Sequence, residues 1–434
     1  MNPTSPAPPD RAALLRDPNF RWLTSGGAIS MLGDQFTLIA LPWLVLRMTG
    51  DTRVLGLVLA LVGVPRAVFI LVGGALVDRY APQRVLMLTK HVNTVLLGAL
   101  AALVFTGTAQ LPVVCVIALA IGVSSAFSIP SGMSMMPHVV RPEQLPAANS
   151  ITMGMRQLTF FVGPLAAGGM IALFGGGGGG DGTMKDANGI ALAFAFDAAS
   201  FAVSAWTLAK VRMRATPPAA ASAGVSSVLA SIAEGLAHFW RDVELRTCFG
   251  YWAAMAIFIM GPLQIALPVL ASRTEGLGAS ALGLMLGAHG AGTLAGMLVS
   301  GAGLRVRFGT LGATLLVFDV VAGALLALLG QIGAAWQGAT LMLLMGVLAG
   351  FMQVSVFTWL QRRVPPRLIG RAMSLFMFIF MGLVPLAAAA TGWVMRAVTL
   401  AQLFAACGAT LVVIAIVAAL FTPMRQVRDP LPAS

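Results

Sequence analysis

One carboxylate, in the middle of a long apolar segment, is the residue of this sequence whose setting points most directly to chemistry. Asp34 lies within residues 20–46, a run long enough to cross a bilayer as a helix, since a span needs about 20 mostly apolar residues. Carboxylates are costly in hydrocarbon, so they usually face a partner or a water-filled path and mark proton or substrate routes. Burial and a nearby arginine shift the proton affinity of a carboxylate in opposite directions. Asp34 is therefore a candidate proton carrier.

Four further charged residues are expected within about 6 Å of the depth of Asp34, counting about 1.5 Å per helical residue. These residues are Arg66, Arg156, Asp197 and Asp319. Arg66 and Arg156 could tune the proton affinity of Asp34, or one of them could hold it in a permanent ion pair. Both interpretations remain open at this stage. Arg156 and Asp197 are expected to form a buried pair between neighbouring spans.

The elements that must position these charges are membrane helices. The chain has 434 residues, is 58% hydrophobic and 10% charged, and has a mean hydropathy of +0.89. Soluble domains carry about 25% charged residues, so the composition excludes an ordinary soluble protein. Apolar runs separated by short polar breaks predict an all-α protein with twelve transmembrane helices. The predicted spans are 20–46, 54–77, 85–106, 111–131, 147–174, 189–209, 246–270, 279–302, 309–330, 337–360, 370–395 and 399–421.

The net charge of +12 reflects membrane topology rather than a surface for nucleic acid. Most lysines and arginines fall in alternate loops, which marks those loops as cytoplasmic. Lys90 is counted among these inner charges. This pattern places both termini in the cytoplasm and the chain in the plasma (inner) membrane as a multi-pass protein. No nucleic-acid partner is expected.

Cofactor and enzyme signatures are missing from the sequence. Cys115, Cys248 and Cys407 show no metal-ligand or disulfide spacing. The run of glycines at 175–180 lacks the Lys-Ser/Thr of a nucleotide-binding loop. We expect no metal, no cofactor, no catalytic residue and no enzymatic activity.

A hydrophilic break at residues 210–245 divides the chain into two halves. An N-terminal tail (1–19) precedes a first six-helix bundle (20–209), and a second bundle (246–421) precedes a C-terminal tail (422–434). Within the break, the apolar spacing from Val225 to Arg246 fits either an amphipathic helix on the inner membrane surface or a plain linker.

The two halves repeat short sequences in the same order. IALP occurs at 39–42 and at 265–268, and PLAA occurs at 164–167 and at 385–388. Internal repeats are how many transporters are built. In this register the counterpart of Asp34 is a methionine at position 260, so the acid has no symmetric partner.

The segment GGALVDRYAPQR at 73–84 carries a recognisable pattern. It resembles the loop between the second and third spans of the major facilitator superfamily, which reads G-x-x-x-D-R-x-G-R-R/K, and it keeps Gly74, Asp78, Arg79 and Arg84. The resemblance implies a charge latch that gates the cytoplasmic face. The alternative is that the two charges at 78 and 79 are simply solvated. The matching segment of the second half has Arg305 in place of the aspartate, so the latch is expected to be asymmetric.

Span five carries GPLAAGG, which resembles, with one extra residue, the GPxxGG motif of antiporters in the same superfamily. Its residues are Gly163, Pro164, Gly168 and Gly169, with Gly154 nine residues before the first. A tight packing seam with no bearing on transport direction is the other interpretation.

Two more segments, 33–50 and 127–150, resemble the branch that exports drugs, siderophores and macrolides. That branch places an acidic residue at the position of Asp34. Many proton-coupled exporters also carry an arginine in span four, and this chain has none between 113 and 131. Arg66 or Arg156 would have to replace it.

The family architecture implies that spans one, four, seven and ten line a central cavity and that Asp197 and Asp319, on the outer support, are structural. By that analogy the cavity wall is apolar with a few hydrogen-bonding groups, which suits amphipathic or cationic molecules. The wall residues expected are Phe36, Phe127, Ser131, Trp252, Gln264, Gln353 and Trp359.

Together these observations predict a major facilitator fold of two pseudo-symmetric six-helix bundles that works by alternating access. The expected function is efflux of small hydrophobic or amphipathic compounds in exchange for protons, by a monomer in the lipid bilayer. Two alternatives remain: an uptake carrier or lysophospholipid transporter, and a membrane receptor or sensor on the same scaffold.

Overall fold

Twelve helices long and apolar enough to cross a membrane make up the described part of this computed structural model, which confirms the predicted number of spans. No strand occurs among the described residues. The described residues are 11–79, 81–175, 188–213, 240–301, 308–365 and 368–427. The expected amphipathic helix after Val225 and most of the glycine run at 175–180 lie outside them.

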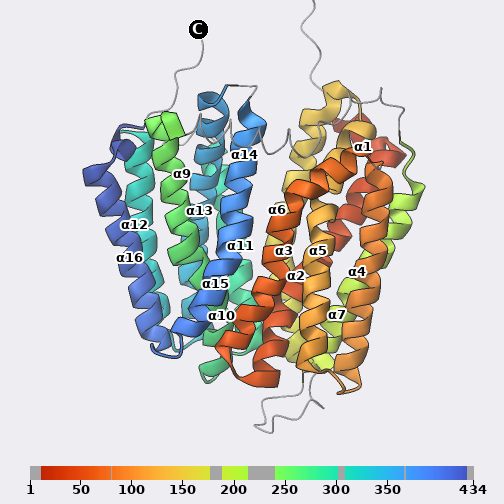
Figure 1. Cartoon of the computed structure of the whole chain (residues 1–434), viewed down its shortest axis with the longest axis horizontal. Helices are drawn as coiled ribbons and strands as arrows, with labels where there is room; N and C mark the ends of the chain where they lie inside the picture. Colours follow the sequence, from red (N-terminus) through yellow and green to blue (C-terminus); the bar gives the residue numbers. More distant parts are fainter. Residues whose placement is uncertain are drawn as a thin grey trace, which may run out of the picture.

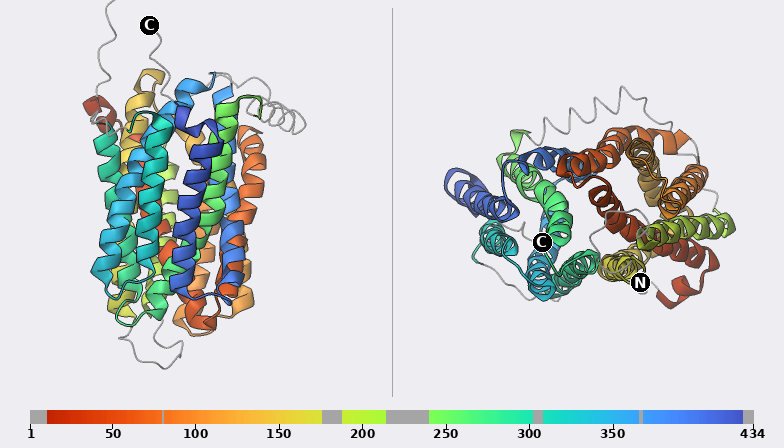
Figure 2. Two further views of the ribbon diagram at one scale, coloured as in Figure 1. Left: turned by 90° about the vertical axis from the view of Figure 1, so that its left-hand side faces the viewer. Right: turned by 90° about the horizontal axis from the view of Figure 1, so that it is seen from below.

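Two groups of helices stand side by side, with the helices running along a common direction (Figures 1 and 2). The N-terminal bundle contains α2 (Pro18–Thr49), α3 (Thr52–Arg79), α4 (Pro82–Phe105), α5 (Leu111–Met135), α6 (Leu145–Phe174) and α7 (Asn188–Lys210). The C-terminal bundle contains α9 (Val243–Met255), η4 (Ala256–Met260), α10 (Gly261–Arg273), α11 (Ala279–Gly301), α12 (Leu311–Leu329), α13 (Ala335–Arg363), α14 (Ile369–Phe378), η6 (Ile379–Leu383), α15 (Val384–Val394) and α16 (Leu400–Phe421).

Two spans of the C-terminal bundle are interrupted by a turn of π-helix. The segment η4 joins α9 to α10, and η6 joins α14 to α15. A proline follows each π segment, Pro262 after η4 and Pro385 after η6. Proline has no N–H to donate, so each of these prolines removes one bond of the regular helical ladder beside the π segment. Among the described residues, the spans of the N-terminal bundle contain no π segment.

Local capping fixes where the first span begins and ends. Asp17 accepts a hydrogen bond from the backbone N–H of Asn19 at 2.8 Å, and a second from that of Phe20, as an N-cap should. Gly50 ends α2 in a left-handed conformation with φ of 61°, which glycine adopts without a steric penalty. These two ends place Asp34 in the middle of the helix.

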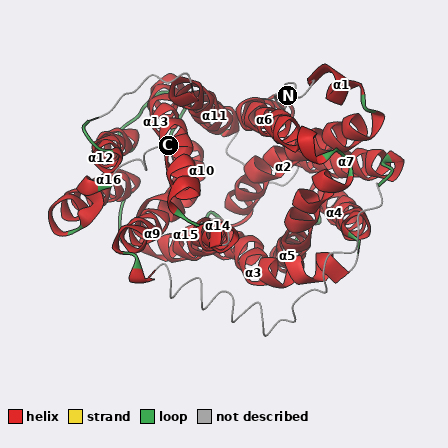
Figure 3. Ribbon diagram, turned by 90° about the horizontal axis from the view of Figure 1, so that it is seen from above, coloured by secondary structure: helices red, strands yellow, loops and turns green. Residues whose placement is uncertain are grey.

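The bundles meet along two pairs of helices, α6 with α11 and α3 with α15. Figure 3 shows the two groups from above, with these pairs at the boundary. At the end of the molecule opposite the first and last described residues, which we call the distal end, the bundles make close contact. There the Thr52 hydroxyl donates to the backbone oxygen of Gly392 at 2.9 Å, and Gly168 packs against Gly283.

Both tails contribute short ordered segments next to the bundles. Residues Arg11–Arg16 of the expected N-terminal tail form the helix α1, and Leu14 of this helix is buried. Near the C-terminal end of the chain, Pro423–Gln426 forms η7, where the Thr310 hydroxyl donates to the backbone oxygen of Arg425 at 2.5 Å.

Candidate functional site

One side of α2 changes from exposed to buried along its length. We call Asp34, Leu38, Leu41 and Val45 the α2 stripe, because they recur at helical spacing. Asp34 is exposed and Leu38 is 45% exposed, whereas Leu41 is 4% and Val45 0% exposed. The stripe is therefore accessible up to the middle of the span and covered from there to the distal end.

The surroundings of α2 show where this stripe points. On other sides of this helix, Gly33 packs against Asp197 and Ser200 of α7, and Gln35 packs against Gly163 of α6. The helix also contacts α3 of its own bundle and α10 and α11 of the other bundle. The side that carries Asp34 thus faces α3 and the boundary between the bundles.

The seventh span has a matching pattern on the other side of the boundary. Ile257 is 39% and Met260 45% exposed, Gln264 is half-buried, and Pro268 is buried. Met260, the repeat counterpart of Asp34, is thus also accessible at mid-span. The two bundles present equivalent positions, and only the N-terminal one is acidic.

Arg66 of α3 and Lys90 of α4 lie within electrostatic range of Asp34. The Arg66 side chain is half-buried, and its Nε atom is buried with no hydrogen-bond partner in the described structure. Arg66, which the sequence proposed as a partner of Asp34, is therefore close to it. No ion pair between the two occurs among the described residues.

A second carboxylate lies behind Asp34, between α2 and α7. Asp197 is 1% exposed and accepts hydrogen bonds from the hydroxyls of Thr37 and Ser200. It is also within electrostatic range of Asp34 and Lys90. Asp197 therefore belongs to the same cluster of charges as Asp34.

Lys90 is not a loop residue, which corrects its assignment to the inner loops. It lies inside α4, is 8% exposed, and donates from Nζ to the Ser30 hydroxyl at 2.7 Å. The same ammonium lies 4.8 Å from the centroid of the Phe201 ring. A lysine inside a predicted span was the signal in the sequence that could have identified it, because charges there are rarely incidental.

The expected buried pair between Arg156 and Asp197 does not form in the described structure. Arg156 is exposed on α6, and its guanidinium lies 5.5 Å from the centroid of the Phe160 ring. The prediction considered depth and neighbouring spans, but the direction of each side chain around its helix decides which groups meet. The structure therefore gives Asp197 hydroxyl partners instead of a guanidinium.

The C-terminal bundle holds one buried carboxylate in its described part. Asp319 of α12 is 2% exposed and accepts a hydrogen bond from the Tyr251 hydroxyl of α9. No cation forms an ion pair with it among the described residues. This carboxylate lies between helices of one bundle, away from the exposed positions at the boundary.

Some of the residues expected to form the cavity wall are buried inside the bundles, and others lie on accessible surfaces. Phe36 is buried against Phe196 of α7, and Trp252 and Trp359 belong to an aromatic cluster inside the C-terminal bundle. Ser131 is buried and donates to the backbone of its own helix, while Phe127 and Gln264 are half-buried and Gln353 is exposed. Phe36, Ser131, Trp252 and Trp359 thus do not line an accessible surface in this conformation.

Little of the predicted cytoplasmic gate can be described at the level of side chains. Gly74, Asp78 and Arg79 lie in the last turns of α3, and their side chains are outside the described structure, whereas Arg84 is exposed in the first turn of α4. Gln83, which replaces a basic residue of the family pattern, donates to backbone oxygens near the end of α7, including Leu208 at 3.1 Å. This contact joins the start of α4 to the end of α7.

The antiporter-like motif divides into tight and open positions. A side chain at Gly168 would meet the backbone of Ala279 and Gly283 on α11, and one at Gly163 would meet Gln35. Gly154 and Gly169 have open space around them. Pro164 lies inside an uninterrupted α6.

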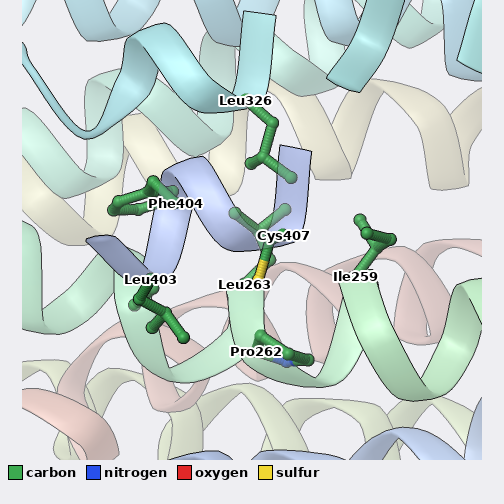
Figure 4. Close-up of a pocket in the computed structure, with 8 residues that line it drawn as sticks. Ile259, Pro262, Leu263, Leu326, Leu403, Phe404 and Cys407 are labelled. Carbon is green, nitrogen blue, oxygen red and sulfur yellow. The ribbon is translucent and has the colours of Figure 1, made fainter. Parts of the chain in front are cut away.

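A small apolar pocket lies within the C-terminal bundle (Figure 4). Its lining residues are Ile259, Pro262, Leu263, Ala266, Leu326, Leu403, Phe404 and Cys407. The lining contains no charged side chain, and the pocket does not include Asp34 or its neighbours. It has the character of a packing defect between helices.

Comparisons with known proteins place the chain in a family. A family model of the Major Facilitator Superfamily matches residues 23–389. The chain is 26% identical over 362 residues to the MFS-type transporter y4rN of Sinorhizobium fredii, covering 81% of this chain and 82% of that protein. It is 23% identical to the enterobactin exporter EntS of Escherichia coli O1:K1, covering 82% and 80%. It is 29% identical to the multidrug efflux pump Tap of Mycolicibacterium fortuitum, over 52% of each chain.

Solved structures show the same fold at low sequence identity. The nucleoside transporter NupG matches with a TM-score of 0.72 at 12% identity, covering 94% of this chain and 99% of that one. A bacterial homologue of the iron transporter ferroportin, in an inward-facing state, matches with a TM-score of 0.67 at 16% identity, covering 92% and 97%. The match to the family model extends over most of the sequence and agrees with the two-bundle architecture. The chain belongs to the Major Facilitator Superfamily and is a multi-pass membrane transporter.

Proposed function

We propose that this transporter exports small hydrophobic or amphipathic compounds in exchange for protons, and that Asp34 carries the proton. The observation that supports this most directly is the α2 stripe, which presents an ionisable group at mid-span where accessibility ends. A group that binds and releases protons in alternation must be reachable from one side at a time. The exposure of Asp34, together with the burial of Leu41 and Val45 toward the distal end, supports this role.

The contacts between bundles support a mechanism of alternating access. The distal end is held by the Thr52–Gly392 hydrogen bond and by the close approach of Gly168 to Gly283. With both termini in the cytoplasm, the distal end is the outer face, and Asp34 communicates with the cytoplasm. Rocking of the bundles about their boundary then exposes the same carboxylate to the outside.

The charges around Asp34 give the proton a role in the cycle. Lys90 and Arg66 are the cations that lie within electrostatic range of Asp34. A change in the contacts of either cation as the bundles move would make Asp34 take up a proton on one side and release it on the other. Asp78 and Arg79 would gate the cytoplasmic side during this movement.

The functions of two similar proteins support export as the direction. Tap is a multidrug efflux pump and EntS is an enterobactin exporter, and both are similar to this chain at 23–29% identity. The accessible apolar side chains at mid-span, such as Leu38 on α2 and Met260 on η4, suit a hydrophobic or amphipathic substrate. We propose that the protein acts as a monomer, since each chain contains both bundles.

Flux of a hydrophobic dye tests the proposal. Purified protein in proteoliposomes is expected to transport ethidium when an imposed pH gradient drives the exchange. Asp34→Asn is expected to abolish this transport without reducing expression. Glu275→Gln, an exposed acid at the distal end, is the matched control and should behave as the parent protein does. Gradient-driven transport by Asp34→Asn at the parental rate would contradict the role of Asp34, and loss of expression would make this residue structural.

A further inference from the structure

Lys90 stands out as a buried charge without a complete set of partners. An ammonium group has three N–H donors, and the described partners of Lys90 are the Ser30 hydroxyl at 2.7 Å and the Phe201 ring at 4.8 Å. No carboxylate lies within ion-pair distance of it in the described structure. A buried charge is costly unless it is paired and hydrogen-bonded, so Lys90 requires the field of nearby acids to remain ionised.

The spacing of residues along α2 brings two acids within reach of Lys90. Ser30 and Asp34 are four residues apart on one helix, which places their Cβ atoms about 5–6 Å from each other. Thr37, one turn further along, holds Asp197 through its hydroxyl. A lysine has a flexible four-carbon stem with rotatable donors, and both acids lie within electrostatic range of Lys90.

The other charged groups on helices that contact α2 are less suited to this role. Arg66 on α3 is within electrostatic range of Asp34, whereas Lys90 is within range of both Asp34 and Asp197. On α6, Arg156 stacks on Phe160. The α10 arginine, Arg273, donates to the backbone oxygen of Gly50 at the distal end, and His289 on α11 makes no described contact with the cluster.

We propose that Lys90 is the internal counter-ion of Asp34 and that it sets the pH at which Asp34 exchanges its proton. In this conformation Lys90 is hydrogen-bonded to Ser30 instead. Asp197 is a positioning residue that keeps Lys90 ionised while Asp34 is neutral. When Asp34, Asp197, Lys90 and Arg66 are all ionised, the two negative charges balance the two positive charges. Protonation of Asp34 leaves one extra positive charge, and Asp197 then becomes the remaining anion for Lys90. This inference rests on the proposed role of Asp34 in proton exchange.

Chemical labelling of Asp34 measures its proton exchange without depending on transport. Dicyclohexylcarbodiimide reacts with protonated carboxyl groups in apolar sites, and mass spectrometry of the peptide containing Asp34 gives a labelling curve against pH. Removing a neighbouring cation disfavours the ionised carboxylate, so Lys90→Met should move the midpoint upward by about one pH unit. Lys90→Arg should keep the midpoint closer to that of the parent protein.

Two further variants separate an electrostatic role from a purely structural one. Ser30→Ala removes the hydroxyl on which Lys90 rests but keeps every charge, so Lys90 should move onto Asp34 and shift the midpoint downward. Lys90→Met combined with Asp197→Asn removes one charge of each sign and should return the midpoint toward the parental value. Lys210→Met, at an exposed lysine near the end of α7, is the matched control and should leave the curve unchanged.

An unchanged midpoint in both Lys90→Met and Ser30→Ala would overturn the proposal. If Lys90→Met does not accumulate, Ser30→Ala alone decides, because an upward or absent shift contradicts the counter-ion role. The labelling experiment and the transport experiment can fail independently of each other. Loss of ethidium flux in Asp34→Asn together with unshifted labelling curves would leave Asp34 as the proton carrier and remove Lys90 from the mechanism.

Discussion

The two bundles place a polar contact between their first and third spans but give it opposite charge. In the N-terminal bundle Lys90 of α4 donates to the hydroxyl of Ser30 on α2, and in the C-terminal bundle Asp319 of α12 accepts from the hydroxyl of Tyr251 on α9. The first contact belongs to a cluster that includes Asp34. The second has no charged partner in the described structure. Each bundle thus joins its first and third spans by a polar contact, but the two contacts differ in charge.

The difference extends to the boundary between the bundles. Asp34 and Met260 are repeat counterparts, and both are accessible at mid-span. Met260 ends the π segment η4, whereas α2 runs without interruption through Asp34. π-Helical turns are frequent at functional sites. We infer that the N-terminal bundle carries the charge chemistry and that the C-terminal bundle provides the irregular helices that adapt during rocking.

Moving the acid from position 34 to position 260 should have the largest effect. Asp34→Met is expected to abolish proton-coupled flux, and adding Met260→Asp should fail to restore it. The described arginines of the C-terminal bundle are exposed, so an acid at 260 has no buried cation among the described residues of its own bundle to favour ionisation. Ethidium flux in proteoliposomes under an imposed pH gradient measures both variants. Recovery of flux in the double variant would show that either bundle can carry the proton.

A bulky residue at the distal contact should have the next largest effect. Gly168→Val would place a side chain against backbone atoms of α11, with the oxygen of Ala279 at 2.6 Å and the Cα of Gly283 at 2.8 Å from the new Cβ. Backbone cannot yield as a side chain does, so the distal end should remain apart and transport should fall about tenfold or more.

The neighbouring glycine supplies the control for that experiment. No atom lies within 4 Å of the position that a Cβ on Gly169 would take, so Gly169→Val should transport at close to the parental rate. Spin labels on the loops after α2 and α10 would report the distal separation. Equal behaviour of the two variants would mean that closure does not depend on this contact.

Loss of the tyrosine hydroxyl should have a moderate effect on stability. Tyr251→Phe leaves Asp319 buried without its described donor, which should cost about 1–3 kcal/mol. Ser200→Ala in the other bundle should cost less, because Asp197 retains the hydroxyl of Thr37. Unfolding in mixed micelles with increasing dodecyl sulfate measures both changes. A larger loss in Ser200→Ala would reverse the order of the two sites.

Hydropathy was enough to predict the twelve spans and the two bundles, because only long apolar helices satisfy backbone groups in lipid. Hydropathy does not predict the rotation of each helix about its own axis. Depth placed Arg156 beside Asp197, but the structure turns Arg156 onto Phe160 and Asp197 onto Thr37. Phe36 was similarly expected on the cavity wall and instead packs against α7.

Lys90 illustrates a different limit of sequence reasoning. It was grouped with loop charges even though it falls within the predicted span 85–106. The positive-inside rule counts charges near helix ends, and Lys90 is the ninth residue of α4, close enough to be mistaken for one of them. Its surroundings became visible only in the structure, which places its ammonium on the Ser30 hydroxyl and within electrostatic range of Asp34 and Asp197. Asp34, in contrast, lies too deep in its span for a loop assignment.

A charge pair at the distal end should have the smallest effect. Asp51 accepts hydrogen bonds from the Arg53 guanidinium, which lies 5.5 Å from the centroid of the Trp393 ring in the other bundle. Arg53 lowers the pKa of Asp51 from 3.8 to about 2. A lowered carboxylate pKa means that the pair contributes fully above the ordinary value and is lost as pH falls toward 2.

Distal closure should therefore show no change due to Asp51 from about pH 5 to pH 8. Asp51→Asn removes the anion that orients Arg53 over Trp393, and it should shift the balance between closed and open distal ends by less than about fivefold, because exposed ion pairs contribute little. The same spin labels measure this shift. A pH-dependent opening in the neutral range that disappears in Asp51→Asn would contradict the assignment, because it would require Asp51 to exchange its proton near neutrality. The charges that respond to pH would then include the distal end as well as the N-terminal cluster.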